Sequence, residues 1–140
     1  MLSSEDMFSK YDKTVKDNYS IVVNSLKGVN ANMFFDLAHM TGLNKHELAE
    51  DIFQISLKTI NRYKENKKKL SPRNSEMILK LIVLYRKGVE VFSSITNFNK
   101  WLHKPSFGLG KKIPYSLMNT TTGIDLIFEE LVRIEYGDLA

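Results

Sequence analysis

The sequence of 140 residues has no cysteine, only three prolines and no long hydrophobic run. The lack of cysteine excludes disulfides, thiolate zinc sites and a cysteine nucleophile, and it fits a reducing compartment. The longest uninterrupted apolar run, Leu81 to Tyr85, is far too short to span a bilayer. The first residues are polar and contain acids, unlike a signal peptide. We therefore expect a soluble, cytoplasmic protein.

The residues that are present suffice for a hydrophobic core. Hydrophobic residues make up 43% and charged residues 26% of the chain, as in ordinary globular domains. A chain of this length buries roughly two thirds of its unfolded surface. Runs of β-branched residues are short, and no Asn-Gly or Asp-Gly hairpin signal joins alternating strands. We predict an all-α fold, a helical bundle of two lobes.

Charge is unevenly distributed along the chain. Residues 57–87 contain ten Lys or Arg and only Glu65 and Glu76, which gives a net charge of +8. From Ile124 onward there are five acids and only Arg133, which gives −4. The first segment suits a polyanionic partner, whereas the terminal segment would be repelled by one.

Apolar spacing and capping residues predict the helices. In the first half we expect helices over residues 6–26, 32–40, 44–53 and 57–65, with a break at Gln54 and Ile55. Ser71 and Pro72 should start a central helix that is shared by both lobes. We expect Gly88 to interrupt that helix. Short helices should follow around residues 98–101 and from Pro114, and a terminal helix after Gly123.

The stretch LNKHELAEDIFQISLKTINRYKEN has the features of a helix-turn-helix. Ala49 is a small residue for the contact between the helices, Ser56 caps the second helix, and that helix has a basic outer face. The predicted DNA-contacting residues are Ser56, Lys58, Thr59, Asn61, Arg62, Lys64, Lys67, Lys68 and Lys69. The alternative is an ordinary helical hairpin whose lysines, those of the loop 67–69 included, are simply solvated.

The terminal segment is a one-sided acidic helix. Its apolar stripe consists of Ile124, Ile127, Phe128, Leu131 and Ile134, and its acids are Asp125, Glu129, Glu130, Glu135 and Asp138. Such a helix either completes the core of its own domain or is placed against a partner. The pattern alone leaves both interpretations open.

No catalytic constellation is evident. The three histidines are scattered, so a metal site is not expected. The stretch GLGKK lacks the residues and the preceding strand of a phosphate-binding loop. Glu129 and Glu130 are adjacent and point roughly 100° apart on a helix, so they do not form an acid and base pair. We predict no catalytic residue, no cofactor and no enzymatic activity.

Residues 101–137, WLHKPSFGLGKKIPYSLMNTTTGIDLIFEELVRIEYG, resemble the toxin-binding domain of the Xre/MbcA/ParS antitoxin family. The shared features are a Trp-Leu pair, a glycine-containing loop, a proline that opens a short helix, a Thr-x-x-Gly helix start and a final Arg-Ile-Glu-Tyr-Gly. The upstream ELAEDIFQISLKTINRYKENKKKLSP is similar to the degenerate Xre-type helix-turn-helix of that family. The resemblance implies three parts: an N-terminal helical extension (1–30), an Xre-like helix-turn-helix domain (31–95) and a toxin-binding domain (96–140).

The resemblance implies an antitoxin of a type II toxin-antitoxin system. Such proteins pair with a RES-domain toxin that consumes NAD, block its active site with their terminal segment, form homodimers and repress their own operon by binding operator DNA. The expected toxin-binding residues are Arg133, Ile134, Glu135, Tyr136 and Gly137. A stand-alone transcriptional regulator whose C-terminal lobe only dimerises is the alternative.

The sequence departs from the family pattern at two places. Gln54 stands where such turns commonly carry glycine, so a left-handed backbone there would be strained. Residues 110–112 read Gly-Lys-Lys, where the family often has paired glycines before the proline.

Overall fold

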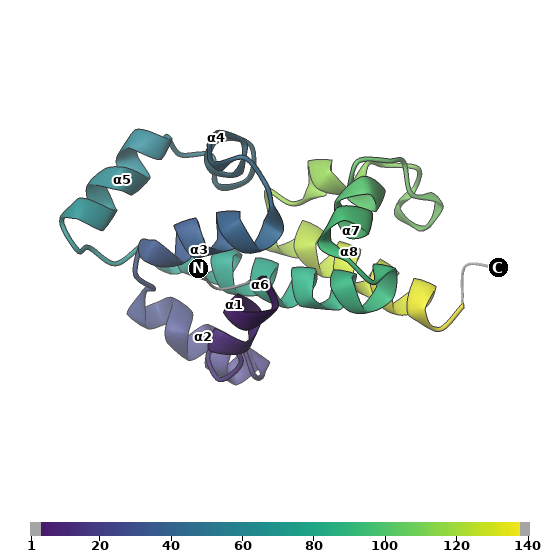
Figure 1. The fold of residues 1–140 in the computed structure, drawn as a ribbon, viewed down its shortest axis with the longest axis horizontal. Coiled ribbons are helices and arrows are strands. Elements are labelled where there is room, and N and C mark those ends of the chain that lie inside the picture. Colours follow the sequence, from purple (N-terminus) through teal and green to yellow (C-terminus); the bar gives the residue numbers. More distant parts are fainter. Residues whose placement is uncertain (1–3, 138–140) are drawn as a thin grey trace. The chain divides into compact units, whose positions relative to one another are not determined.

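A computed structural model describes residues 4–137, and its fold is all-α, as predicted (Figure 1). Its helices are α1 (Ser4–Lys10), α2 (Asn18–Lys27), α3 (Asn32–Thr41), α4 (Lys45–Glu47), the π-helix η1 (Leu48–Phe53), α5 (Leu57–Glu65), α6 (Pro72–Phe92), α7 (Ile95–Leu102), the 3-10 helices η2 (Phe107–Leu109) and η3 (Pro114–Leu117), and α8 (Thr121–Glu135). Within the described range no helix is long and apolar enough to cross a membrane.

The chain forms two compact units, Met1–Ile82 and Val83–Ala140, called unit 1 and unit 2 below. The division falls inside α6, so the first part of this helix belongs to unit 1 and its last turns belong to unit 2. Each unit has its own buried side chains. Unit 1 buries Phe34, Phe53 and Ile60, whereas unit 2 buries Phe98 and Ile127.

The single helix expected over residues 6–26 is wrong, because α1 ends at Lys10 and α2 begins at Asn18. Asp17 has an extended backbone, and its carboxylate accepts a hydrogen bond from the Ser20 amide at 2.8 Å. A capping aspartate starts a new helix there. The bend between the two helices lets Tyr11 and Val15 reach the core.

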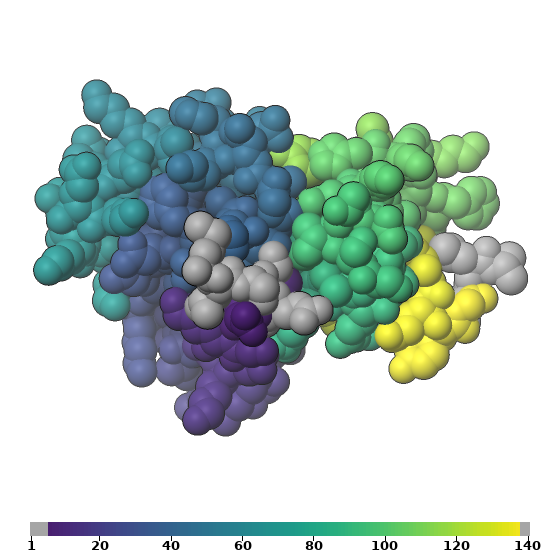
Figure 2. All heavy atoms as spheres, viewed as in Figure 1, coloured from purple at the N-terminus to yellow at the C-terminus, as the bar shows by residue number. Residues whose placement is uncertain are grey.

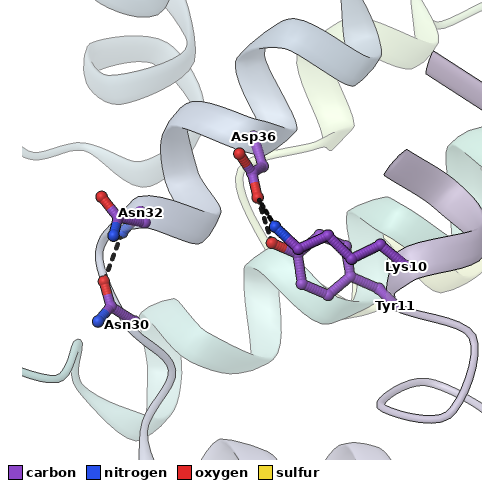
Figure 3. A network of polar contacts seen from close by, with 5 residues as sticks. All are labelled: Lys10, Tyr11, Asn30, Asn32 and Asp36. Carbon is purple, nitrogen blue, oxygen red and sulfur yellow. Dashed lines mark hydrogen bonds and ion pairs between the residues drawn. The ribbon is translucent and has the colours of Figure 1, made fainter. Parts of the chain in front are cut away.

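A polar network fastens the end of α1 to α3 (Figure 3). The Tyr11 hydroxyl donates to Asp36 Oδ2, and Lys10 Nζ lies 3.3 Å from the same oxygen. Burial and the neighbouring carboxylate raise the pKa of Tyr11. In the same view the Asn30 side chain accepts from the Asn32 amide and starts α3.

The region predicted to form a helix-turn-helix has an irregular first helix and a regular second one. The expected α-helix over residues 44–53 is α-helical only from Lys45 to Glu47 and then winds as the π-helix η1. The wider turn packs Leu48, Ala49 and Phe53 into the core together. The second helix, α5, has the predicted bounds, and the Ser56 hydroxyl caps it by accepting from the Thr59 amide at 3.1 Å.

The central helix α6 begins at Pro72, as predicted, with the Ser71 hydroxyl accepting from the Asn74 amide. The expected interruption at Gly88 is wrong, because α6 runs on to Phe92. A Cβ on Gly88 would lie 2.4 Å from the Phe98 ring. The glycine therefore serves close packing of the ring on the helix backbone, and it does not end the helix.

The terminal helix α8 begins at Thr121, three residues before Ile124, where it was predicted to start. The Thr120 hydroxyl accepts from the Gly123 amide at 2.9 Å. A Cβ on Gly123 would lie 1.8 Å from the Leu117 carbonyl oxygen. The Thr-x-x-Gly pattern therefore caps α8 and lets η3 pack against its first turn.

Candidate functional site

Four of the predicted DNA-contacting side chains of α5 lie on its outer face, whereas Thr59 is half-buried. Ile60 points into the core of unit 1, while Lys58, Asn61, Arg62 and Lys64 are exposed. Figure 2 shows this teal stretch at the surface of its unit. The helix therefore has one buried side and one basic side.

Two further residues from α4 join this basic face, and the sequence reasoning missed them. Lys45 Nζ and Lys64 Nζ lie 5.8 and 4.7 Å from the centre of the Phe35 ring. His46 lines an open hollow together with Lys58 and residues of α5. The sequence pattern gives no sign of this grouping, because Lys45 and His46 reach the α5 face only through packing between helices.

The loop with Lys67, Lys68 and Lys69 is held by backbone contacts. The Lys68 amide donates to the Tyr63 carbonyl at 2.9 Å, and Lys67 has a φ of 53°. Lys69 forms an isolated antiparallel bridge with Asn30. The three lysines are exposed, so the loop presents charge from a fixed backbone.

In unit 2 the apolar stripe of α8 faces the core of the unit itself. Ile124, Ile127 and Leu131 are fully buried, and Phe128 and Ile134 are half-buried. The last turn is different, because Tyr136 is 74% exposed and Gly137 is exposed as well. The helix therefore completes its own domain and leaves its end at the surface.

The acids of α8 do not form one exposed face. Glu130 is completely buried and accepts a bond from Arg133 Nε at 2.8 Å, so its expected contribution to an acidic surface is wrong. Glu135 pairs with Lys87 at 2.6 Å, and this contact raises the pKa of the lysine. Asp125 and Glu129 are exposed. The remaining predicted acid, Asp138, lies outside the described residues.

Residues 105–113 form a closed hairpin-like loop, called the Phe107 loop below. The Ser106 amide donates to the Lys112 carbonyl, and the Lys111 amide donates to the Ser106 carbonyl, both at 2.9 Å. Gly110 and Lys111 both have left-handed backbones, with φ of 65° and 64°. Two consecutive left-handed residues make a type I′ turn, so Lys111 adopts the backbone that the usual second glycine would take.

Glu130 fastens this loop to α8. The Ser106 hydroxyl donates to Glu130 Oε2 at 3.3 Å, and Arg133 binds the other carboxylate oxygen. Gly108 lies against the same carboxylate, because a Cβ there would be 2.0 Å from Glu130 Oε2. A single buried acid therefore positions both the loop and Arg133, one of the predicted toxin-binding residues.

The described residues contain no group of three or more His, Asp or Glu side chains placed to hold a metal ion. His103 stacks on Tyr115 with ring centres 4.7 Å apart, and its Nδ1 lies 2.7 Å from the Asn99 carbonyl oxygen. Trp101 packs against Phe92 and Phe98 and is half-buried.

The described residues form an all-α protein whose unit 1 has a basic exposed side on α5 and whose unit 2 exposes the final turn of α8. Residues 87–137 match the family of the antitoxin Xre/MbcA/ParS C-terminal toxin-binding domain. This part of the chain is therefore similar to a toxin-binding domain, and the match supports an antitoxin role. No curated protein matches the sequence.

Proposed function

We propose that this antitoxin neutralises a RES-type, NAD-consuming toxin by placing its C-terminal segment in the active-site cleft of the toxin. The observation that carries the proposal is the exposed end of α8 within a toxin-binding domain. Ile127 and Leu131 anchor the helix in its own core, so the following turn can enter a cleft without loss of the fold. We assign the contacts to Arg133, Ile134, Glu135, Tyr136 and Gly137.

The charge of the C-terminal segment supports its insertion into the cleft of the toxin. Glu129 and Glu135 lie near the exposed end of α8, and a pocket that binds the phosphates of NAD is electropositive. The ion pair between Glu135 and Lys87 holds the carboxylate at the surface before binding. Because NAD and operator DNA are both cytoplasmic, the proposal places the complex in the cytoplasm.

The test is a truncated chain that ends at Arg133, co-expressed with the toxin. The truncation removes the exposed turn but retains the buried Ile127 and Leu131, so the fold should persist, as circular dichroism would check. We expect loss of neutralisation, measured as arrested growth. Full protection by the truncated and folded chain would refute occlusion by this segment.

We further propose that residues 31–95 are an Xre-like helix-turn-helix domain that represses the operon of the antitoxin. The predicted contacts are Ser56, Lys58, Thr59, Asn61, Arg62, Lys64 and the loop Lys67, Lys68 and Lys69. Support comes from the exposed basic side of α5 and from the added charge of Lys45.

Operator binding can be tested by its salt dependence. Each phosphate contact lowers the log-log slope of affinity against salt by about 0.9. Lys58→Ala should therefore make the slope shallower by about one contact, whereas Lys13→Ala, an exposed lysine outside α5, should leave it unchanged. Equal slopes for all three chains would exclude a Lys58 phosphate contact.

We propose that α2, within the N-terminal extension, forms the homodimer. Tyr19, Val22 and Leu26 lie on one face of α2 and are 77%, 51% and 70% exposed. Antiparallel pairing about a two-fold axis near Val22 brings Asp17 opposite Lys27 of the partner subunit, so the end charges are complementary. Val22→Glu should convert the dimer to a monomer in sedimentation analysis, and a wild-type chain that is monomeric at micromolar concentration would contradict the assignment.

The stand-alone regulator is the second candidate, favoured only by the basic face of α5. It requires that no toxin binds the chain. Co-purification of a toxin encoded next to the antitoxin gene decides between the two.

A further inference from the structure

The Phe107 loop carries an aromatic side chain that its own unit does not use. Phe107 is 83% exposed, more than any other large hydrophobic residue of the described chain. Ile113, at the end of the loop, is also exposed. A solvent-facing phenyl ring contributes nothing to the core of its own unit, and exposed aromatics on ordered loops are frequent anchors in protein interfaces.

The loop is rigid, which distinguishes Phe107 from an incidental surface residue. Backbone bonds between Ser106 and Lys112 and the type I′ turn close it. The buried carboxylate of Glu130 accepts a hydrogen bond from the Ser106 hydroxyl of the loop. Burial of a carboxylate is unfavourable unless it is paired. The pairing of Glu130 with the loop and with Arg133 therefore ties the position of the loop to a buried charge. A loop whose backbone is already held loses little conformational entropy when a partner covers it.

The surroundings of Phe107 define the chemistry of the partner. Lys104, Lys111 and Lys112 are exposed on the same segment, and residues 94–119 contain no acid. An apolar anchor with a basic rim fits an apolar pocket with carboxylates at its edge. A nucleic acid fits less well, because the exposed Glu129 of the adjoining α8 would repel it.

The loop is continuous with the end of α8. The short helix η2 of the loop contacts α8, and Glu130 binds Ser106 of the loop and Arg133 of the last turns. Figure 1 shows the loop beside α8 in unit 2. Arg133 keeps 41% of its side chain exposed, so it joins the loop surface to that of Tyr136.

We propose that the Phe107 loop is a second toxin-binding element, with Phe107 as the apolar anchor, the lysines as a basic rim and Glu130 as a positioning residue. The inference rests on the proposed antitoxin function. The terminal turn then blocks the catalytic cleft, while the loop binds the surface of the toxin outside the cleft and supplies affinity.

The test measures the dissociation constant between the full-length antitoxin and the RES-domain product of the neighbouring gene, inactivated by mutation. Phe107→Ala should raise Kd by about tenfold or more. Lys13→Ala changes an exposed residue of unit 1 that lies in none of the proposed interfaces, and it is the control that should leave Kd unchanged. Lys112→Glu should also weaken binding, and its effect should shrink as salt is added.

Gly108→Ala tests the positioning role of Glu130. The added Cβ would displace the loop from the carboxylate without removing a side chain that faces the toxin. We expect Gly108→Ala to raise Kd. Phe107→Ala should leave the melting temperature unchanged, because the exposed ring does not contribute to folding.

The outcomes separate the two proposals. If the wild-type chain binds the toxin and Phe107→Ala binds equally well, the loop assignment is wrong and the antitoxin function stands. A loss of operator affinity in Phe107→Ala, with toxin affinity unchanged, would assign the loop to nucleic acid and also overturn the proposal. If the wild-type chain does not bind the toxin at all, both proposals fail.

Discussion

At the scale of single residues, the backbone of this protein places side chains where glycine is usual. Gln54, Lys67, Ser93 and Lys111 all have φ between 53° and 73°. A left-handed conformation is sterically unfavourable for residues with a Cβ. Gln54 and Lys67 lie at either end of α5, so two of these four residues flank the proposed DNA-binding helix.

Substitution of Gln54 by glycine should therefore stabilise the protein. Gln54 has φ 59° and ψ 36° and an exposed side chain, so glycine removes strain and no buried contact. We expect the free energy of unfolding in urea to rise by about 0.5–1 kcal/mol. Gln54→Ala is the control, because it retains a Cβ and should give no gain. Equal stabilities for the glycine and alanine variants would show that the turn is not strained.

Gly88 shows two effects of opposite sign at one position. In an exposed helix interior, alanine is more favourable than glycine by about 1 kcal/mol. At Gly88 the new methyl group would overlap the fully buried Phe98 ring, which is also packed edge-on against Tyr85 at 4.9 Å.

Packing should decide the sign at this position. We expect Gly88→Ala to lower the free energy of unfolding by about 1–3 kcal/mol, since buried aromatic rings shift little. Chemical denaturation measures the change. A stabilised Gly88→Ala variant would show that the ring moves aside without loss.

At the scale of the elements, capping residues in the sequence correctly predicted where several helices begin. Ser56 and Ser71 cap the helices that they were expected to cap, and α5 has its predicted bounds. The break after α1 was missed because the apolar spacing continues through it, although Asp17 supplied a capping signal. The π-helix η1 had no local signal, since it depends on how Phe53 packs.

The candidate site was predictable only in part, for the same reason. The buried position of Glu130 could not be read from the sequence, because its partners Ser106 and Gly108 come from a loop that folds back on α8. The exposed Phe107 was likewise hidden, as an aromatic residue in a loop is expected to pack inward. The exposed character of Tyr136, at the end of an amphipathic helix, followed from its place after the apolar stripe.

The tyrosines that fix α1 and α6 give the protein a defined sensitivity to alkali. Burial raises the pKa of both Tyr11 and Tyr85, and each hydroxyl donates a hydrogen bond, to Asp36 and Asn99 respectively. Both side chains are neutral below their ordinary pKa of about 10 in the folded and unfolded states, so their contribution is constant there. Above that pH the unfolded chain loses protons that the folded chain keeps.

Stability should therefore fall as the pH rises above about 10, and it should not change through this mechanism between pH 7 and 9. Urea denaturation at a series of pH values measures the slope. Tyr11→Phe should make the alkaline slope shallower, because one of the two buried hydroxyls is gone. An unchanged slope would show that Tyr11 ionises in the folded protein as readily as in the unfolded chain.

At the scale of the whole molecule, the basic side of α5 and the end of α8 belong to different units of the chain. The basic side of α5 belongs to unit 1, and the exposed end of α8 belongs to unit 2. Lys87 lies in the basic segment of the sequence but pairs with Glu135 and Glu90 in unit 2, so it does not add to the α5 face. The proposed mechanism therefore assigns one partner to each unit.

The most direct test of the central claim is the inhibition of NAD turnover by the purified toxin at increasing NAD concentrations. If the last turn of α8 occupies the NAD-binding cleft, the antitoxin and NAD exclude each other, and the apparent inhibition constant rises in proportion to NAD. Tyr136→Ala should weaken inhibition at every NAD concentration. An inhibition constant that does not depend on NAD would mean that the antitoxin binds elsewhere, and it would contradict the account.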